Sequence, residues 1–261
     1  MTLPTPKRDL GQHFLIDENI LGVIGRLAEL GHDDVALEIG PGPGALTAYL
    51  ADRVADVHAV ELDRRLEPYL TERFGERSNV HLRFEDALSL DPSELVPPPT
   101  KLVSNLPYNV ATPIVVESLE QFPTVGLWSV MVQREVADRF IAEPRTKAYG
   151  AVSVLIQLMT ERTGFHPVSR TVFRPQPNVD SALVAFRRRP QPPPVPWPQL
   201  KLVVEAAFAH RRKRLPNSLE LAGIADRERA AAALATIGRS KQVRAEELEP
   251  QEFVGLAAAL A

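Results

Sequence analysis

Asn105, Pro107 and Tyr108 combine an amide, a rigid turn and an aromatic ring in the segment Ser104-Asn105-Leu106-Pro107-Tyr108, which ends an apolar run. The side-chain oxygen of Asn105 and a backbone carbonyl near Leu106 and Pro107 can each accept one hydrogen of a planar amine. The Tyr108 ring can stack on the heterocycle that bears this amine. The segment therefore suits the exocyclic nitrogen of adenine, and an ordinary strand-ending turn is the alternative.

A glycine-rich loop, Glu38-Ile39-Gly40-Pro41-Gly42-Pro43-Gly44, joins a strand-like run to a helical pattern. Glycines let the backbone turn sharply and approach a ligand closely. In open α/β sheets, ligands bind in the crevice at the carboxyl ends of the strands. The spacing is Gly-x-Gly-x-Gly and not the dinucleotide pattern Gly-x-Gly-x-x-Gly, so the loop alone indicates a ligand only weakly, and a tight strand-to-helix turn is the alternative.

Acidic residues end the next two strand-like runs. Glu61 lies 21 residues after Gly40, where a carboxylate accepts both hydroxyls of a ribose and disfavours a 2′-phosphate. Asp86, followed by Ala87, is placed to accept from the amino group of an adenine. These consecutive strand ends predict a pocket for an adenosine with free ribose hydroxyls. S-adenosylmethionine fits this pocket best, and a nicotinamide dinucleotide is the rival.

Strand-like and helix-like segments alternate over the first two-thirds of the chain. This alternation predicts parallel strands with helices on both faces, and two later β-like runs suit the edge of a mixed sheet. We therefore expect a Rossmann-like, doubly wound α/β domain with seven strands. The expected strands are 35–39, 57–62, 80–84, 102–103, 127–132, 163–168 and 182–186, and the expected helices in this part include 45–54 and 64–74.

A proline-rich stretch divides the chain. Six prolines in the nine residues from Pro190 to Pro198 exclude a helix interior and a central strand. Residues beyond it are rich in Ala and Leu at helical spacing, without a strand signal. We expect an α/β domain over 1–189, a linker over 190–199 and a small all-helical domain over 200–261.

The composition restricts the class of protein. The chain of 261 residues has no cysteine, which excludes disulfides and thiolate metal sites. No leader-like segment or bilayer-spanning apolar run is apparent, so we expect a soluble, cytoplasmic protein. Residues 162–214 hold eleven Lys and Arg against two acids, a local charge of +9 that leaves −12 for the rest of the chain. This stretch suits phosphate binding, and a solvated basic face is the alternative.

Six motifs in order resemble those of the ribosomal RNA adenine N6-dimethyltransferases. They are Gly11-Gln12-His13-Phe14-Leu15, Glu38–Gly44, Val60-Glu61-Leu62-Asp63, Glu85-Asp86-Ala87, Asn105-Leu106-Pro107-Tyr108-Asn109 and Met131-Val132-Gln133-Arg134-Glu135-Val136. Three later segments, 147–154, 173–182 and 208–219, resemble the small-subunit enzymes (the KsgA group) more than the Erm methylases of the large subunit. The resemblance covers nearly the whole chain. Pro43 and Pro216 look like departures from the family pattern.

The resemblance implies S-adenosylmethionine as the cofactor and no metal. In the family, the N-terminal segment with His13 closes over the methionine end of the cofactor, Glu61 binds the ribose, and Asp86 binds the adenine amine. The cofactor-binding residues implied are His13, Leu15, Gly40, Gly42, Glu61, Asp86, Ala87 and Asn105. Hydrogen bonds from N6 to Asn105 and a backbone carbonyl would aim its lone pair at the sulfonium methyl, so no strong general base is required.

The resemblance also implies a substrate. The family adds two methyl groups to N6 of each of two adjacent adenosines in the 3′-terminal hairpin loop of 16S rRNA, in the 30S particle or its precursor. Tyr108 would stack on one face of the flipped adenine and Phe173 on the other, unless Phe173 is a core aromatic. The expected catalytic residues are Asn105, Leu106, Pro107, Tyr108 and Phe173, and the expected RNA-binding residues are Arg145, Lys147, Arg211, Arg212, Lys213 and Arg214. We expect a monomer that acts in ribosome biogenesis and has no membrane partner.

Three other functions are weighed against this one. An Erm-type methylase is disfavoured by the segments 173–182 and 211–213. A noncatalytic assembly or transcription factor with the same fold is disfavoured by the intact Asn105–Tyr108 turn and Glu61. A dinucleotide-dependent oxidoreductase is disfavoured because no His, Lys and Tyr set for hydride chemistry stands out.

Overall fold

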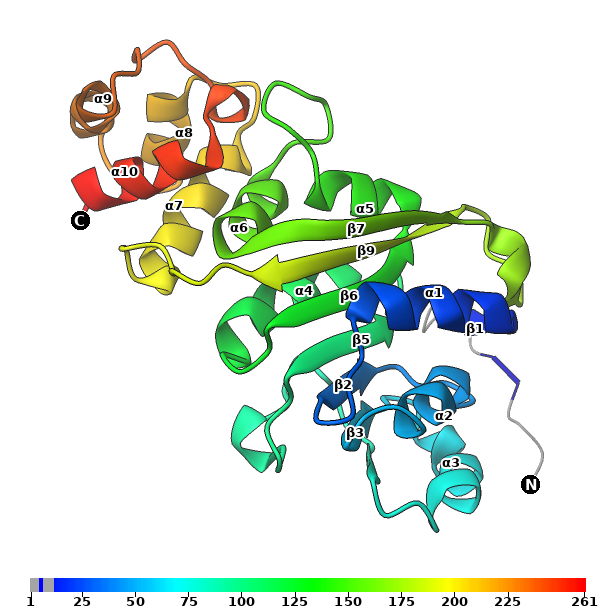
Figure 1. Ribbon diagram of the computed structural model, residues 1–261. Coiled ribbons are helices and arrows are strands. Elements are labelled where there is room, and N and C mark those ends of the chain that lie inside the picture. Colours follow the sequence, from blue (N-terminus) through cyan, green and yellow to red (C-terminus); the bar gives the residue numbers. More distant parts are fainter. Residues whose placement is uncertain (1–4, 7–11) are drawn as a thin grey trace. The chain divides into compact units, whose positions relative to one another are not determined.

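Seven strands form one sheet that carries the predicted strand ends (Figure 1). The computed structural model describes residues 5–6 and 12–261. The strand order is β4-β3-β2-β5-β6-β9-β7, in which β2 to β6 pair in parallel and β9 pairs antiparallel with β6. The strands are β2 (Val35–Ile39), β3 (Asp56–Val60), β4 (Val80–Arg83), β5 (Lys101–Asn105), β6 (Leu127–Gln133), β7 (Thr160–Val168) and β9 (Ser181–Arg188).

The predicted doubly wound α/β sheet with seven strands is confirmed, including its mixed edge. The helix expected over 64–74 begins later, as α3 (Glu67–Phe74), with Pro68 in its first turn. Proline favours this position because the missing N–H has no partner in a helix start. Residues Arg64–Leu66 form a separate 3₁₀ turn, in which the Asp63 side chain accepts from the Arg65 backbone N–H.

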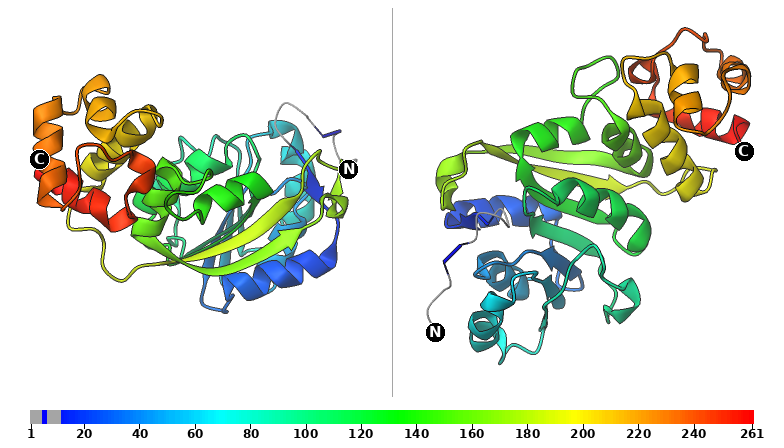
Figure 2. Two further views of the ribbon diagram at one scale, coloured as in Figure 1. Left: turned by 90° about the horizontal axis from the view of Figure 1, so that it is seen from above. Right: turned by 180° about the vertical axis from the view of Figure 1, so that it is seen from behind.

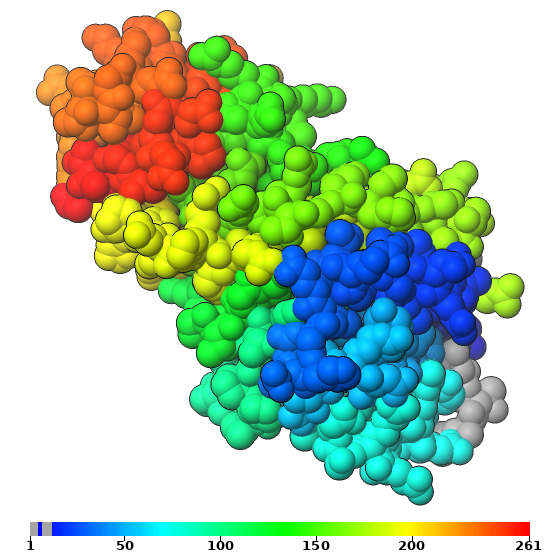
Figure 3. Space-filling view, viewed as in Figure 1, coloured from blue at the N-terminus to red at the C-terminus, as the bar shows by residue number. Residues whose placement is uncertain are grey.

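Helices cover both faces of the sheet. Helices α1 (Glu18–Ala28) and α2 (Ala45–Ala51) lie on one face, and α4 (Ala111–Gln121) lies on the other (Figures 1 and 2). Figure 3 shows α1, in dark blue, on the outside of the sheet beside α2. The helices on this first face cover an apolar core. They do not cover the carboxyl ends of the parallel strands, where the predicted site residues lie.

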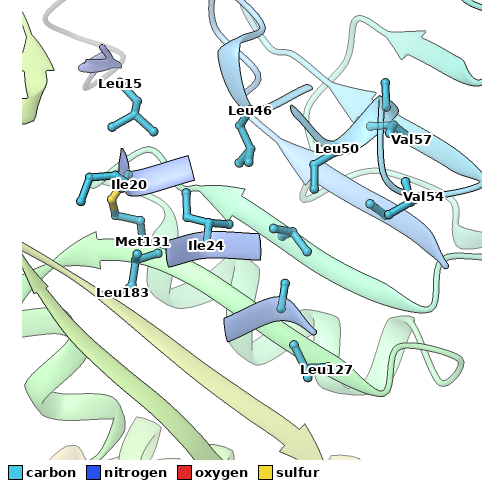
Figure 4. Packing of buried hydrophobic residues seen from close by; sticks show 14 of the residues in the cluster. Leu15, Ile20, Ile24, Leu46, Leu50, Val54, Val57, Leu127, Met131 and Leu183 are labelled. Carbon is cyan, nitrogen blue, oxygen red and sulfur yellow. The ribbon is translucent and has the colours of Figure 1, made fainter. Parts of the chain in front are cut away.

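The core under α1 explains why that helix forms. Ile20 and Ile24 face inward from α1 at a helical spacing of four residues, and both lie in one cluster with Met131 of β6 and Leu183 of β9 (Figure 4). The Asp17 side chain caps the helix by accepting from the Asn19 backbone N–H. Burial of such side chains is worth roughly 1.5–3 kcal/mol each, so the packing supplies most of the stability of this short helix.

The strand register brings the predicted chemistry together. Ile39 pairs with Val60, and Val60 pairs with Arg83, so β2, β3 and β4 end level with one another. Parallel strands that end level place the residues that follow them at one edge of the sheet. The glycine loop, Glu61 and the segment with Asp86 therefore meet there, although these segments lie about twenty residues apart in sequence.

The second unit is helical. The chain divides by contacts into one unit of residues 1–137 and 162–188 and another of residues 138–161 and 189–261. The helices of the second unit are α6 (Ala151–Met159), α7 (Trp197–Ala209), α8 (Leu215–Leu221), α9 (Arg227–Thr236) and α10 (Pro250–Ala259), and α5 (Arg134–Phe140) spans the boundary. The predicted C-terminal helical region is confirmed. The functional boundaries expected at 189 and 199 stay a prediction, and residues 138–161 group with the C-terminal helices.

Tyr149 holds residues 138–161 within this helical unit. Its ring is fully buried with an edge-on contact to Phe208 of α7, and its hydroxyl donates to the Leu248 carbonyl at 2.9 Å. Helix α7 begins at Trp197, inside the predicted linker, because Pro198 is tolerated in a first helical turn. None of the helices in the described part of the chain is long and apolar enough to cross a membrane.

The structure accounts for Pro216, whose effect was not predicted. Pro216 is the second residue of α8, where proline removes no helical hydrogen bond. The basic run 210–214 precedes it as the turn between α7 and α8, and Arg212 and Lys213 are exposed. These cations are therefore displayed on a turn between two helices.

Candidate functional site

A pocket lies at the carboxyl ends of the parallel strands. It encloses about 1110 Å³ of space, counted to its open mouth. Most of the predicted cofactor-binding and catalytic residues line it. Those present are His13, Leu15, Gly40, Gly42, Glu61, Asp86, Ala87, Asn105, Leu106, Pro107 and Tyr108, and the one absent is Phe173. The structure therefore brings together residues from five separate segments of the chain.

The glycine loop forms one wall of the pocket, and its glycines have no room for side chains. Gly40 and Gly42 have φ values of 75° and 56°, a region that costs other residues about 1–2 kcal/mol. A Cβ on Gly40 would lie 3.2 Å from the Pro107 ring, and one on Gly42 would lie 3.0 Å from the Phe14 ring. The backbone of this loop is thus free to contact a ligand directly.

Glu61 is nearly buried at the centre of the pocket. One carboxylate oxygen accepts from the Gly42 backbone N–H at 3.1 Å, and the other accepts from the Asp63 backbone N–H at 2.9 Å. Burial raises the pKa of Glu61, although these hydrogen bonds oppose the rise. These hydrogen bonds hold the side chain in place, and the carboxylate keeps acceptor capacity for a ligand hydroxyl.

Asp63 anchors the segment that follows Glu61. The Arg65 guanidinium bonds both carboxylate oxygens, at 2.9 and 2.6 Å, and Gln12 donates to the same carboxylate at 3.1 Å. The hydrogen bond from Arg65 holds the pKa of Asp63 at about 2. Asp63 is therefore ionised at neutral pH, and it ties the N-terminal segment to the rim of the pocket.

Glu38 is a pocket residue to which the sequence analysis assigned no role. Its side chain is 1% exposed and accepts from the Thr47 hydroxyl at 2.6 Å. Burial raises the pKa of Glu38 from its ordinary value of 4.5 to about 8, the Thr47 bond opposes this rise, and the nearby charge of Glu61 adds to it. The sequence did contain a signal for Glu38. It is the one charged residue in an apolar strand, which is unusual, and it stands just before the glycine loop.

We expect Glu38→Gln to stabilise the protein, and to do so increasingly as the pH rises. Below about pH 4.5, Glu38 is protonated in both folded and unfolded chains and the substitution changes little. Between about pH 4.5 and 8, only the unfolded chain loses the proton, so burial of the carboxyl group destabilises the native state by about 1.4 kcal/mol per pKa unit crossed. Urea unfolding at pH 5 and pH 8.5 measures the difference.

A matched substitution provides the control for this stability experiment. Glu67 is exposed at the start of α3, so Glu67→Gln should change the unfolding free energy by no more than about 0.5 kcal/mol at either pH. A Glu38→Gln variant that gained no stability between the two pH values relative to this control would contradict the assigned protonation state.

Two exposed leucines stand beside the acids at the mouth of the pocket. Leu62 and Leu88 line the pocket and are 54% and 38% exposed. Asp86 is held by its own turn, since its carboxylate accepts from the Leu88 backbone N–H at 3.0 Å. Neither leucine was predicted from the sequence, although an apolar residue within two positions of a ligand-binding acid was a usable signal. The rim offers two apolar surfaces and a carboxylate, as a purine requires.

Asn105 is oriented by the N-terminal segment. Its side-chain N–H donates to the His13 carbonyl at 3.2 Å, which leaves the amide oxygen as the acceptor for a ligand. The backbone of the next residue, Leu106, donates to the Met131 carbonyl at 3.0 Å. The turn that follows β5 is therefore fixed on both its side chain and its backbone.

Tyr108 is fixed at both its hydroxyl and its ring. The hydroxyl and the Ser181 hydroxyl lie 2.6 Å apart, and the His13 ring lies beside the Tyr108 ring with centroids 5.3 Å apart. The Nδ1 atom of His13 donates to the Pro175 carbonyl at 2.8 Å. Burial raises the pKa of Tyr108, so its hydroxyl stays neutral at physiological pH.

Phe173 lies in the core. Strand β1 (Phe14–Leu15) pairs antiparallel with β8 (Phe173–Arg174), so Leu15 lies opposite Phe173. Phe173 is 3% exposed and belongs to the same apolar cluster as Leu15. Phe173 does not line the pocket, and its predicted place beside a flipped adenine stays a prediction. Gly11, which begins the same motif, lies outside the described residues.

The predicted RNA-binding residues gather within the helical unit. The Arg211 guanidinium donates to the Lys147 carbonyl at 3.3 Å and pairs with Glu246 at the same distance. The Arg145 backbone N–H donates to the Glu246 carbonyl at 2.7 Å. The loop with Arg145 and Lys147 therefore lies against the turn with Arg211, and the side chains of Arg145, Lys147, Arg212, Lys213 and Arg214 are exposed.

Comparison with known proteins agrees with this geometry. A family model described as "Ribosomal RNA adenine dimethylase" matches residues 5–260. The "Ribosomal RNA small subunit methyltransferase A" of Rubrobacter xylanophilus is 49% identical over 97% of this chain and 94% of its own length. The protein of the same name from Bacillus mycoides is 43% identical over 97% of this chain and 91% of its own length.

Solved structures share the fold over most of the chain. A dimethyladenosine transferase from Plasmodium falciparum superposes with a TM-score of 0.79 at 21% identity, over 94% of this chain and 96% of its own. At that identity, the likeness concerns the fold alone. The 23S rRNA methyltransferase ErmE superposes with a TM-score of 0.67 at 31% identity, over 95% of this chain and 99% of its own.

Proposed function

Because this chain belongs to the ribosomal RNA adenine dimethylase family, we propose that it transfers methyl groups from S-adenosylmethionine to N6 of two adjacent adenosines in the 3′-terminal hairpin loop of 16S rRNA. The family assignment confirms the predicted enzyme class, an rRNA adenine dimethyltransferase. The observation that carries the proposal is that Glu61, Asp86 and Asn105, from three strand ends, line one pocket.

The small subunit is the proposed target because this chain is more similar in sequence to small-subunit enzymes than to a large-subunit enzyme. Relatives named for the small subunit are up to 49% identical to this chain, whereas the large-subunit enzyme ErmE is 31% identical. The segments 173–182 and 211–213 are the features that favoured the small-subunit branch in the sequence. We place the substrate in the 30S particle or its precursor on the same basis.

The residues of the pocket fit S-adenosylmethionine. The held carboxylate of Glu61 would accept the ribose hydroxyls, Asp86 would accept from the adenine amine, and Leu62 would cover one face of that adenine. A Cβ on Gly40 would crowd the Pro107 ring at 3.2 Å, so the loop would present backbone to the cofactor there. When bound, the cofactor supplies an electrophilic sulfonium methyl group.

We expect Glu61→Gln to weaken S-adenosylmethionine binding about 10- to 100-fold, because hydrogen bonds to a charged group are worth about 1.5–3 kcal/mol. The amide keeps the volume of the side chain but loses the charge and one acceptor oxygen. Isothermal titration calorimetry measures the dissociation constant. Glu85→Gln, a partly exposed neighbour in the same pocket, should change it less than about two-fold. Equal affinities for the Glu61→Gln variant and the parent protein would contradict the ribose assignment.

Asn105 and the backbone beside it would prepare the target amine. The N6 lone pair is delocalised into the purine ring, so it attacks poorly. Acceptance of one N6 hydrogen by the Asn105 oxygen and of the other by a carbonyl near Leu106 and Pro107 favours a more tetrahedral nitrogen that points at the methyl group. Tyr108 would support one face of the base, and the product ammonium is acidic enough to lose its proton to water.

The exposed cations of the helical unit would bind the RNA backbone. Arg212, Lys213 and Arg145 can contact phosphates, which give orientation and salt-dependent affinity without reading bases. This role agrees with a chain whose net charge is −3 overall but strongly positive over residues 162–214.

Transfer of labelled methyl groups tests the proposed function. The protein is incubated with labelled S-adenosylmethionine and 30S subunits that lack dimethyladenosine, and 23S rRNA is offered in parallel. We expect label in N6,N6-dimethyladenosine of the small-subunit RNA and none in 23S rRNA. Label only in 23S rRNA would indicate an Erm-type activity, and no label in either RNA would favour the noncatalytic alternative.

A further inference from the structure

Val179 is an exposed apolar side chain in the segment that leads to Ser181, the hydroxyl partner of Tyr108. It is 47% exposed in the loop between β8 and β9, among polar residues. Ser181, two residues further on, contacts the Tyr108 hydroxyl at 2.6 Å. Two residues of chain span at most about 7 Å, so Val179 lies in the short segment whose Ser181 contacts the ring proposed to hold the target adenine.

The loop around Val179 is held on both sides. The Arg170 guanidinium donates to the Asn178 carbonyl at 3.1 Å, and the Arg170 backbone N–H donates to the Asp180 carboxylate at 3.1 Å. The Asp180 carbonyl also accepts from the Arg134 backbone N–H at 3.0 Å. Because both neighbours of Val179 are bonded, the backbone of the loop cannot move away without breaking these contacts.

Cations and an aromatic ring surround the loop within the sheet unit. The Arg134 guanidinium lies 4.9 Å above the Phe165 ring, and Arg134, Arg170 and Arg174 are all exposed. Such an arrangement suits a phosphate backbone that follows the loop. The occupant with matching charge is therefore the RNA strand on either side of the target adenine.

We infer that Val179 is a wedge that fills the space left in the RNA stack when the target adenine swings into the pocket, while Arg134 and Arg170 hold the neighbouring phosphates. The inference rests on the proposed function. Extrusion of a base costs a few kcal/mol of stacking, and apolar side chains offset such costs by inserting between bases. A rigid, exposed valine beside the acceptor site has the chemistry for this task.

Single-turnover methyl transfer to two matched substrates tests the wedge. Both are 30S subunits reconstituted with a synthetic 3′ RNA fragment, and in one of them the nucleotide next to the target adenine is abasic. Without that neighbouring base, the target adenine has no stacking partner on one side. Val179 then has no lost stacking contact to replace. We expect Val179→Ala to lower the rate about 10-fold on the natural loop and less than about two-fold on the abasic loop.

Val96→Ala is the matched control. Val96 is 73% exposed and does not line the pocket, so its loss should change neither rate by more than about two-fold. Equal losses on both substrates, or none on the natural loop, would overturn the wedge. Failure of the parent protein to methylate either substrate would instead overturn the proposed function. Unchanged cofactor affinity of the Val179→Ala variant confirms that the pocket is intact.

Discussion

Asn105→Ala is expected to reduce methyl transfer at least about 100- to 1,000-fold, the loss typical of removing one preorganised polar group from an active site. The substitution removes the acceptor for one N6 hydrogen. It also removes the donor to the His13 carbonyl, which holds the N-terminal segment across the pocket. Single-turnover transfer of labelled methyl groups to 30S subunits measures the effect, because it isolates the chemical step from product release.

The control for this experiment is a second asparagine on the same turn. Asn109 is exposed, lines the pocket and has no assigned role, so Asn109→Ala should stay within about three-fold of the parent rate. Calorimetry measures the cofactor affinity of the Asn105→Ala variant, and rates at saturating S-adenosylmethionine separate the loss in the chemical step from any loss of affinity caused by the broken contact to His13. An Asn105→Ala variant with more than about a hundredth of the parent rate would refute the role assigned to the amide.

Gly44→Ala is expected to destabilise the protein by about 2–5 kcal/mol. Gly44 has a φ of 81°, which costs an L-residue about 1–2 kcal/mol. A Cβ there would lie 2.4 Å from the buried Phe74 ring, and overpacking of a core costs about 1–3 kcal/mol more. Urea unfolding measures the loss. It is a large part of the free energy of unfolding of a typical domain, which is roughly 5–15 kcal/mol.

Gly126→Ala is the matched control for Gly44→Ala. A Cβ on Gly126 would meet no atom within 4 Å, and Gly126 is not among the glycines with positive φ. Its unfolding free energy should therefore change by less than about 1 kcal/mol. Equal stabilities of the two variants would show that the helix start at α2 relaxes around an added methyl group.

Residue patterns along the chain are enough to place most of the proposed site. The apolar runs before Gly40, Glu61 and Asn105 predict parallel strands, and parallel strands end at one edge of the sheet. The pocket follows from this rule without knowledge of any contact. The helical C-terminal region is predictable for a similar reason, since helical spacing and the proline-rich stretch are local features of the chain.

Contacts between segments that are distant in sequence determine the features of the site that residue patterns do not predict. Phe173 is buried because β1, more than 150 residues earlier, pairs with β8 and covers it. Asn105 has its orientation because the His13 carbonyl accepts from it, and Glu38 has its raised pKa because the completed core excludes water from it. Residue type and spacing carry local propensity and the order of strands. Burial, pairing partners and protonation depend on which segments meet in space, so no local pattern contains them.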